Sequence, residues 1–243
     1  MTLAEFFGCT CLAFGPPFTM FVFTIAHDPI RIIILVAAAF FWLVSLLLSS
    51  IVWVALIPIK TYLQFAIFYT VLFQEIFRFA IYKILRRAEY GLKKITENST
   101  TLTENKHILA YVSGLGFGIM SGAFSLINIL ADAVGPGTMG LKAGKETFFL
   151  TSSAIGLCFI LLNTFWSVIF FNACDNRNYI NLGYVILSHL LASYLTLLNS
   201  QYNYWECITT LYILMIFTGC FALKIAGGTI HSLTNGLKFK ATI

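Results

Sequence analysis

Residues 113–122 read Ser-Gly-Leu-Gly-Phe-Gly-Ile-Met-Ser-Gly and lie inside a long apolar run. Gly114, Gly118 and Gly122 recur at every fourth position, so in a helix they share one face and leave it without side chains. In water, each interior glycine costs a helix roughly 1 kcal/mol relative to alanine. In a bilayer the helix is the conformation that satisfies this backbone, and a bare face lets another helix approach closely. The stretch therefore predicts a membrane-spanning helix that packs tightly against a neighbour.

The sequence leaves open which helix covers this glycine face. Ser121 flanks the same surface and adds a second kind of small residue to it. One alternative is a neighbouring helix of the same chain, and the other is a helix of a different subunit. Under either alternative, Gly114, Gly118, Gly122 and Ser121 are the expected helix-packing residues, and under the second alternative they are also assembly residues.

The composition is typical of a membrane protein with several spans. Of the 243 residues, 59% are hydrophobic and only 10% are charged, and the mean hydropathy is +0.86. Long uncharged runs dominate, so we expect one all-α membrane domain over residues 1–243. The lysines and arginines flank the apolar runs, so the net charge of +5 bears on orientation and does not indicate nucleic-acid binding.

Apolar runs long enough to cross a bilayer occur at seven places along the chain. They lie at about Leu3–Ile25, Ile30–Ile57, Thr61–Leu85, Ile108–Ala131, Thr147–Phe171, Tyr179–Leu198 and Cys207–Ala226. Gly15-Pro16-Pro17 in the first run predicts a kink or break, because proline removes backbone donors. The longest connection is residues 86–107, and a short tail covers residues 229–243.

Basic residues are distributed unequally between the two ends of these spans. One end has Arg31, Lys83, Arg86, Arg87, Lys93, Lys94, Lys106, Arg177, Lys224, Lys238 and Lys240, whereas the other has only Lys60, Lys142 and Lys145. Cytosolic connections carry the excess of Lys and Arg. We therefore expect a lumenal or extracellular N-terminus, a cytosolic C-terminus, and a cytosolic 86–107 connection and tail. The sequon at Asn98 is then cytosolic and unglycosylated.

Two groups of polar side chains lie at membrane depth, where each needs a partner or a cavity. Glu75 and Arg78, three residues apart in the third span, are predicted to form an ion pair. The alternatives are snorkelling of Arg78 and contact with a partner or a lipid headgroup. Asn163 in the fifth span and His189 in the sixth lie at similar depth across a short turn. We expect them, with Thr164, to form an intramembrane polar pocket, either as a structural contact or as a functional cavity.

The sequence offers little for catalysis and indicates no cofactor. The aspartates Asp28, Asp132 and Asp175 all lie at span boundaries, which excludes an intramembrane aspartyl dyad. There is no HExxH motif or paired CxxC set for a metal. Ser121 and His189 imitate the order of a rhomboid-like serine protease, but the Gly-x-Ser-Gly box is absent. This protease and an independent membrane transporter are kept as the alternatives.

Several motifs are spread over almost the whole chain. They are Phe6-Phe7-Gly8-Cys9, Phe14-Gly15-Pro16, the block from Asp28 to Ser49, Gln74 to Phe79, Ala110 to Gly122, Ile127 to Asp132, Gly135-Pro136-Gly137, Phe165-Trp166, Phe170-Phe171, Ser188 to Leu191 and Ala226-Gly227-Gly228. With this set the chain resembles the anterior-pharynx-defective subunits of gamma-secretase, and insect members in particular.

The resemblance implies a non-catalytic scaffold with seven spans and a lumenal N-terminus. It implies assembly with nicastrin, presenilin and the small presenilin-enhancer subunit, in a complex that cleaves type I membrane proteins such as Notch and amyloid precursor relatives. It also implies assembly in the endoplasmic reticulum and Golgi, a mature location at the plasma membrane and endosomes, and contact with membrane lipids.

The chain departs from this family at one position. The family typically carries an intramembrane histidine in each of the fifth and sixth spans. His189 matches the second, whereas Asn163 stands at the first. Asparagine still donates and accepts hydrogen bonds but cannot become a cation, so a role that needs two protonated histidines is not expected.

Overall fold

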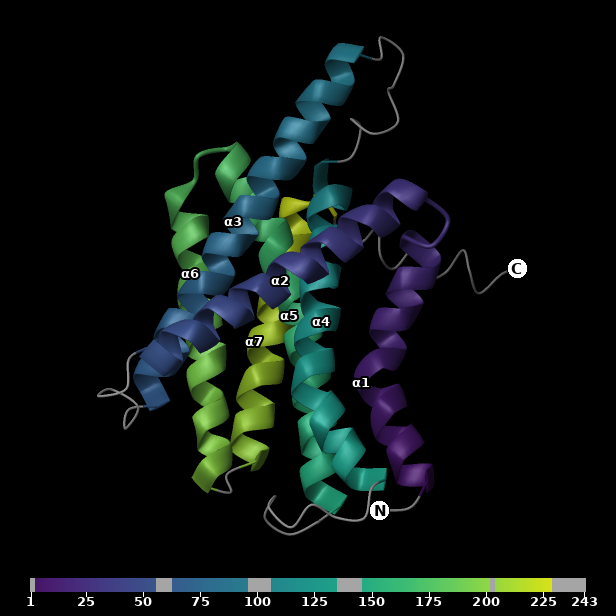
Figure 1. Cartoon of the computed structure of the whole chain (residues 1–243), viewed down its shortest axis with the longest axis vertical. Coiled ribbons are helices and arrows are strands. Elements are labelled where there is room, and N and C mark those ends of the chain that lie inside the picture. The colour runs from purple at the N-terminus through teal and green to yellow at the C-terminus, as the bar shows by residue number, and fades with distance from the viewer. Residues whose placement is uncertain (1–2, 56–62, 96–105, 135–145, 202–203, 229–243) are drawn as a thin grey trace.

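The computed structural model describes residues 3–55, 63–95, 106–134, 146–201 and 204–228, and these residues are mainly helical (Figure 1). The helices in this described part are α1 (Leu3–Thr24), α2 (Pro29–Ala55), α3 (Leu63–Ile95), α4 (Lys106–Val134), α5 (Glu146–Asp175), α6 (Tyr179–Leu195), the short 3-10 helix η2 (Thr196–Gln201) and α7 (Tyr204–Ile225). Seven of them are long and apolar enough to cross a membrane. This confirms the predicted all-α protein with seven spans.

Two local predictions need correction. α3 continues to Ile95, so residues 86–95 of the expected connection are helical. They are rich in Arg, Lys and Glu, which favour helices, and Arg86 pairs with Glu89 at 2.8 Å. α1 is a single helix containing Pro16 and Pro17, so of the predicted kink or break the break does not occur, and the kink stays a prediction. The rest of the connection, with Asn98, and the tail 229–243 lie outside the described residues.

α5 is the central helix of the bundle. Of its apolar span, 72% of the residues are buried, compared with 17% in α1 and in α7. It packs against α4, α7, α1 and α6, while α2 lies against α4 and α3, and α3 lies against α6. Figure 1 shows α2 crossing α4 obliquely. Because α5 has neighbours on all sides, its polar side chains must find partners within the protein.

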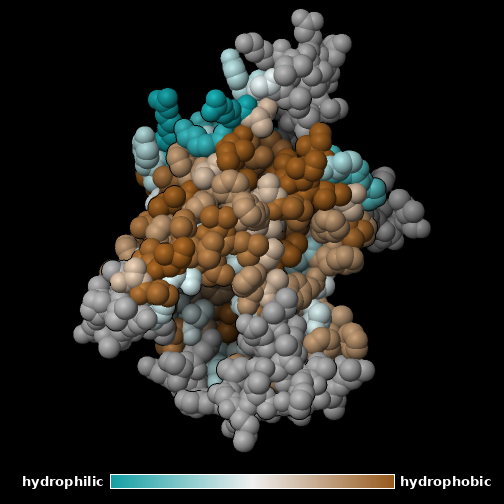
Figure 2. Space-filling view, viewed as in Figure 1, coloured by the Kyte–Doolittle hydropathy of each residue, from teal (hydrophilic) through white to brown (hydrophobic). Residues whose placement is uncertain are grey.

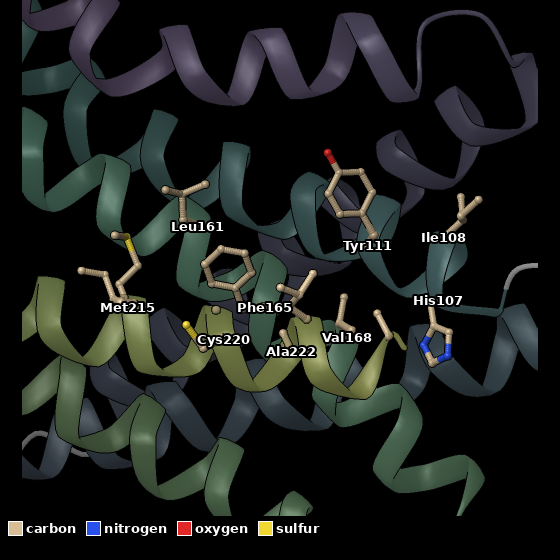
Figure 3. A pocket seen from close by; sticks show the side chains of 13 residues that line it. His107, Ile108, Tyr111, Leu161, Phe165, Val168, Met215, Cys220 and Ala222 are labelled. Carbon is tan, nitrogen blue, oxygen red and sulfur yellow. The ribbon is translucent and has the colours of Figure 1, made fainter. Parts of the chain in front are cut away.

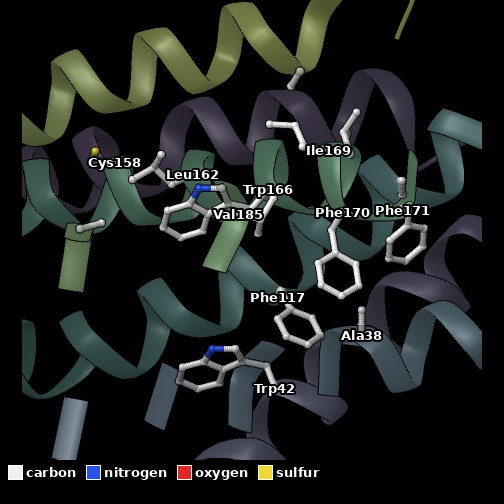
Figure 4. Close-up of a cluster of buried hydrophobic side chains, with 14 of the residues drawn as sticks. Ala38, Trp42, Phe117, Cys158, Leu162, Trp166, Ile169, Phe170, Phe171 and Val185 are labelled. Atoms are coloured by element: carbon white, nitrogen blue, oxygen red, sulfur yellow. The ribbon is translucent and has the colours of Figure 1, made fainter. Parts of the chain in front are cut away.

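Aromatic residues of three helices form the main hydrophobic core. Trp42 of α2, Phe117 of α4, and Trp166 and Phe171 of α5 are buried in one cluster (Figure 4). Phe117 lies between Gly116 and Gly118 of the glycine-rich stretch, and its side chain packs in this cluster.

The surface is divided between a broad apolar region and one hydrophilic end. In Figure 2 the apolar side chains cover the middle of the visible face, and hydrophilic ones gather at the top. That end holds the C-terminal half of α3 and the turn between α5 and α6 (Figure 1). An apolar belt next to a charged end is what a membrane-embedded helix bundle requires.

An ion-pair network joins α3 to the end of α5 at this hydrophilic end. Arg86 Nε donates to Asp175 Oδ1 at 2.9 Å, and Arg86 Nη2 pairs with Asp175 Oδ2. Tyr82 Oη donates to Asp175 Oδ1 at 2.9 Å. The arginine and aspartate side chains are only 17% and 20% exposed, so this bidentate pair is partly shielded from water and fixes the register of α3 on α5.

Asp175→Asn should lower the stability of the purified chain by about 1–2 kcal/mol, because the partly buried Arg86 loses the bidentate partner on α5 and keeps only Glu89 of its own helix. The matched control is Asp28→Asn. Asp28 pairs with Arg31 at 3.2 Å, but both side chains are about one-third exposed, and such pairs contribute at most about 1 kcal/mol. Denaturant unfolding in detergent micelles would measure both. Equal losses in the two variants would contradict the assigned network.

Candidate functional site

A buried arginine joins the two polar groups that the sequence suggested as separate sites. The side chain of Arg78 on α3 is 0% exposed. Its Nη2 donates to Asn163 Oδ1 at 2.8 Å, and its Nη1 donates to the Asn163 carbonyl at 3.0 Å and to Ser167 Oγ at 2.5 Å. Arg78 does not snorkel to the surface, because these α5 acceptors hold its guanidinium inside the bundle.

Glu75 provides the negative charge of this polar cluster, which consists of Glu75, Arg78, Asn163, Ser167 and His189. Its Oε2 lies 3.2 Å from Arg78 Nε, and its Oε1 accepts a hydrogen bond of 2.6 Å from His189 Nδ1 on α6. Glu75 is 4% exposed and His189 is 3% exposed. A buried carboxylate requires partners on both oxygens, and here it receives one from its own helix and one from α6.

Aromatic rings enclose the cluster. The indole of Trp166 stacks on the His189 ring, with 4.3 Å between centroids and 26° between planes. The guanidinium carbon of Arg78 lies 5.2 Å from the centre of the Phe117 ring. Ring faces attract cations and exclude water, so the polar groups are sealed within the hydrophobic core.

The glycine face of α4 lies against α5 of the same chain. A Cβ added at Gly114 would lie 2.7 Å from Ser167 Cβ and 2.9 Å from Thr164 Cα, and one at Gly118 would lie 3.0 Å from Ile160 Cα. At Gly122 the nearest atoms belong instead to the flexible Ile160 side chain. The helix that covers the glycine face is therefore α5 of the same chain, which is the first of the two alternatives that the sequence left open.

The same strip of α5 contacts the glycine face of α4 and contributes to the polar cluster. Ile160, Thr164 and Ser167 touch the glycine face, while Asn163 and Ser167 accept hydrogen bonds from Arg78. Positions separated by three, four and seven residues share a helix face. The close α4–α5 contact and the polar cluster are thus built on the same side of α5.

The remaining sequence-predicted residues lie differently from expectation. Asn163 and His189 are linked through Arg78 and Glu75, and Asn163 Nδ2 donates to the Phe159 carbonyl at 3.0 Å. Thr164 Oγ1 donates to the Ile160 carbonyl of its own helix at 2.9 Å, so its role is in packing. Ser121 borders a separate cavity of about 300 Å³ with hydroxyl groups of Ser125, Ser152 and Thr196.

Sequence reasoning missed Ser167 as a member of the polar cluster, and Trp166 and Phe117 as the aromatic residues that enclose it. Ser167 follows Asn163 by one helical turn, so its spacing was a usable signal. The stacking of Trp166 and the position of Phe117 depend on how α3, α4 and α6 pack on α5, which no local pattern contains.

The geometry offers no support for a serine protease. His189 is held by Glu75 and Trp166, whereas the residues lining the cavity at Ser121 include no histidine. In the described part of the chain, no group of three or more His, Cys, Asp and Glu residues could hold a metal ion. Asp28 and Asp175 pair with arginines at helix ends, and the side chain of Asp132 lies outside the described residues.

Comparison with known proteins identifies the family. The family described as "Aph-1 protein" matches residues 4–229. The chain belongs to the Aph-1 family. It is 62% identical over 232 residues to the Drosophila melanogaster protein named gamma-secretase subunit Aph-1, covering 96% of this chain and 97% of that protein. The match to mouse gamma-secretase subunit APH-1B is 46% over 242 residues, covering 96% and 93%. The match to Caenorhabditis elegans gamma-secretase subunit aph-1 is 33% over 256 residues, covering 95% and 83%.

These relatives agree with the resemblance read from the motifs, including its insect character. With the seven apolar helices, they make this Aph-1 family member an integral membrane protein with several spans.

Glu75→Gln should destabilise the folded chain by roughly 3–5 kcal/mol, because it leaves a buried, uncompensated arginine. The double variant Glu75→Gln with Arg78→Met should recover most of this loss, since both charges are then absent. Glu206→Gln is the control, because Glu206 is exposed at the start of α7. Unfolding in detergent measures all three. A double variant no more stable than Glu75→Gln alone would contradict the pairing.

Proposed function

We propose that this chain is the Aph-1 subunit of a gamma-secretase complex and acts as a non-catalytic scaffold for intramembrane proteolysis. The observation that carries the proposal is the 62% identity, over nearly the full length of both chains, to a protein named gamma-secretase subunit Aph-1. The described polar groups support it, because Glu75, Arg78 and His189 are engaged with one another inside the bundle. They are therefore better suited to structure than to turnover.

The partners in this proposal are nicastrin, presenilin and the small presenilin-enhancer subunit, and the substrates of the complex are type I membrane proteins such as Notch and amyloid precursor relatives. Assembly takes place in the endoplasmic reticulum and Golgi, and the mature complex resides at the plasma membrane and in endosomes. The N-terminus is lumenal or extracellular, in keeping with the excess of basic residues at the opposite end of the spans. A glycan on Asn98 would overturn this orientation.

The glycine residues contribute to assembly indirectly in this proposal. α5 already covers Gly114 and Gly118, so no partner helix reaches them. They set the distance between α4 and α5 and thereby the shape of the outer helix faces. α2 offers such a face, with Ile33, Phe40 and Leu47 each at least 60% exposed. A partner or lipid covers these side chains in the membrane.

Gly118→Leu tests the scaffold role. A side chain at Gly118 meets the backbone of Ile160, which cannot move aside, so α4 and α5 must separate. With a tagged chain in cells lacking their own Aph-1 protein, we expect at least a fivefold loss of co-purified nicastrin and presenilin and of substrate cleavage. Gly183→Leu on α6 is the control, because a Cβ there meets nothing within 4 Å.

Two results would overturn the proposal. The first is a wild-type chain that behaves independently. It would purify without partners, or it would show enzymatic turnover or transport flux by itself, and His189→Ala would abolish that activity. The second is normal complex assembly with Gly118→Leu.

A comparison of Gly122→Ala with Gly118→Ala tests whether close helix packing causes the assembly defect. At Gly122 only the flexible Ile160 side chain must move to admit a methyl group, so Gly122→Ala is the milder change. Its defect should be clearly smaller than that of Gly118→Ala.

A further inference from the structure

Two features of the described surface lie outside the polar cluster. One is an apolar groove of about 580 Å³ between α4, α5 and α7 (Figure 3). Phe165, Met215 and Leu223 are typical of its described lining, which includes no lysine, arginine or carboxylate, so no charge there selects an occupant. The other is the charged C-terminal end of α3, residues 83–95, where the side chains do define a chemistry.

The C-terminal end of α3 carries an accessible tyrosine. Figure 1 shows this end projecting past the other helices. Arg86 anchors α3 to Asp175 of α5, and Tyr90, one turn later, is 73% exposed. A Cβ added at Gly91 would meet nothing within 4 Å. The phenol of Tyr90 can therefore be reached by an enzyme without separating any packed helices.

Basic residues surround Tyr90 along the helix. Arg86 and Arg87 come four and three positions before it, and Lys93 and Lys94 come three and four positions after it. Positions three and four apart are neighbours on a helix face, so all four such positions around Tyr90 hold a basic residue. A phosphate on the phenol carries about −1.5 to −2 charges at neutral pH and pairs with cations of this kind. The helix end is thus prepared for a phosphorylated tyrosine.

The segment around Tyr90 also suits a protein kinase, which binds its substrate residues in an extended form. Gly91 makes local opening of α3 about fivefold easier than alanine would, because glycine is a poor helix former. Opening also frees Glu89 from Arg86, to which it pairs at 2.8 Å in the closed helix. Glu89 then provides an acidic side chain directly before the tyrosine, where many tyrosine kinases have a basic subsite.

We propose that Tyr90 is phosphorylated by a cytosolic protein tyrosine kinase through local opening of the end of α3. Tyr90 Oη attacks the γ-phosphorus of ATP, and the new O–P bond replaces the bond from that phosphorus to the β–γ bridging oxygen. ADP leaves, and the phenolic proton passes to the catalytic aspartate of the kinase. In the reclosed helix the phosphate pairs with Arg87. Only the access of a cytosolic enzyme rests on the orientation in the proposed function.

The first test incubates the purified complex, and the full chain alone, with ATP and a recombinant non-receptor tyrosine kinase, and locates phosphate by peptide mass spectrometry. Tyr90 should react about tenfold faster than Tyr179, because the hairpin between α5 and α6 opens less readily. Tyr179 is the matched control, since it is 78% exposed at the same end of the bundle but follows the capping residue Asn178. Tyr90→Phe should remove the phosphate. No phosphate on Tyr90, or equal rates at the two tyrosines, would overturn the proposal.

Gly91→Ala tests the opening step. It should slow phosphorylation of Tyr90 about fivefold, because alanine favours the closed helix. Gly183→Ala is the control, since a Cβ there also meets nothing within 4 Å but lies on α6, and it should leave the rate unchanged. Equal rates in the two variants would contradict the opening on which the proposal depends.

Hydrogen exchange tests the phosphate's pairing in the closed helix. Amides of residues 83–95 should exchange about twofold more slowly once Tyr90 is phosphorylated, because opposite charges three residues apart stabilise a helix. Arg87→Gln should remove this slowing. Lys83→Gln should keep it, since Lys83 is exposed but lies two turns from Tyr90. The same response in both variants would overturn the assigned pairing.

A measurement in cells separates this proposal from the proposed function. The tagged chain from cells treated with a tyrosine phosphatase inhibitor should carry phosphate at Tyr90. Orientation is measured apart with Ala88→Cys at an exposed position of α3, in a Cys11→Ser, Cys220→Ser background. This variant should react with an impermeant maleimide only after permeabilisation. An unmodified Tyr90, or reaction of Ala88→Cys in intact cells, would overturn cytosolic phosphorylation, whereas co-purification of nicastrin and presenilin reports on the scaffold role independently.

Discussion

The interior of this bundle depends on one buried cation. Arg78 is fully buried in a chain that crosses a bilayer, where an uncompensated charge costs several kcal/mol. Compensation requires Glu75 on the same helix and oxygen acceptors on α5, and Glu75 in turn requires His189 on α6. These requirements fix α3, α5 and α6 at a common depth. Apolar contacts alone would allow the helices to slide, because lipid competes equally well for apolar surfaces.

The glycine face allows this constraint to extend to α4. Gly114 and Gly118 place the α4 backbone directly on Thr164 and Ile160 of α5. The same approach brings Phe117, which lies between them in the sequence, to 5.2 Å from the Arg78 guanidinium. A bulkier α4 face would move this ring away and leave the cation beside a gap. The glycines therefore have two roles. They allow close helix packing, and they bring the Phe117 ring to the polar cluster, where it covers the cation.

The sequence could predict the membrane-spanning helices and the individual polar residues, because both follow from local patterns. Apolar run lengths gave seven spans, and the spacing of Glu75 and Arg78 predicted contact along one helix. The sequence could not show that this pair meets Asn163 and His189, since the meeting depends on how α3 packs on α5 and α6. It also could not choose the helix that covers the glycines. The end of α3 was misplaced because charged residues signal the membrane boundary without ending a helix.

Asn163 is chemically well suited to its position opposite Arg78. Its carbonyl oxygen accepts from the guanidinium while its amide donates to the Phe159 carbonyl, so both ends of the side chain are satisfied in one orientation. An imidazole there, which the family resemblance leads one to expect, would have to stay neutral and present its unprotonated nitrogen to Arg78. Protonation would bring two cations together in a buried site with one carboxylate. Asparagine removes that possibility, so a second cation beside Arg78 could arise only at His189, whose ring is already held by Glu75 and Trp166.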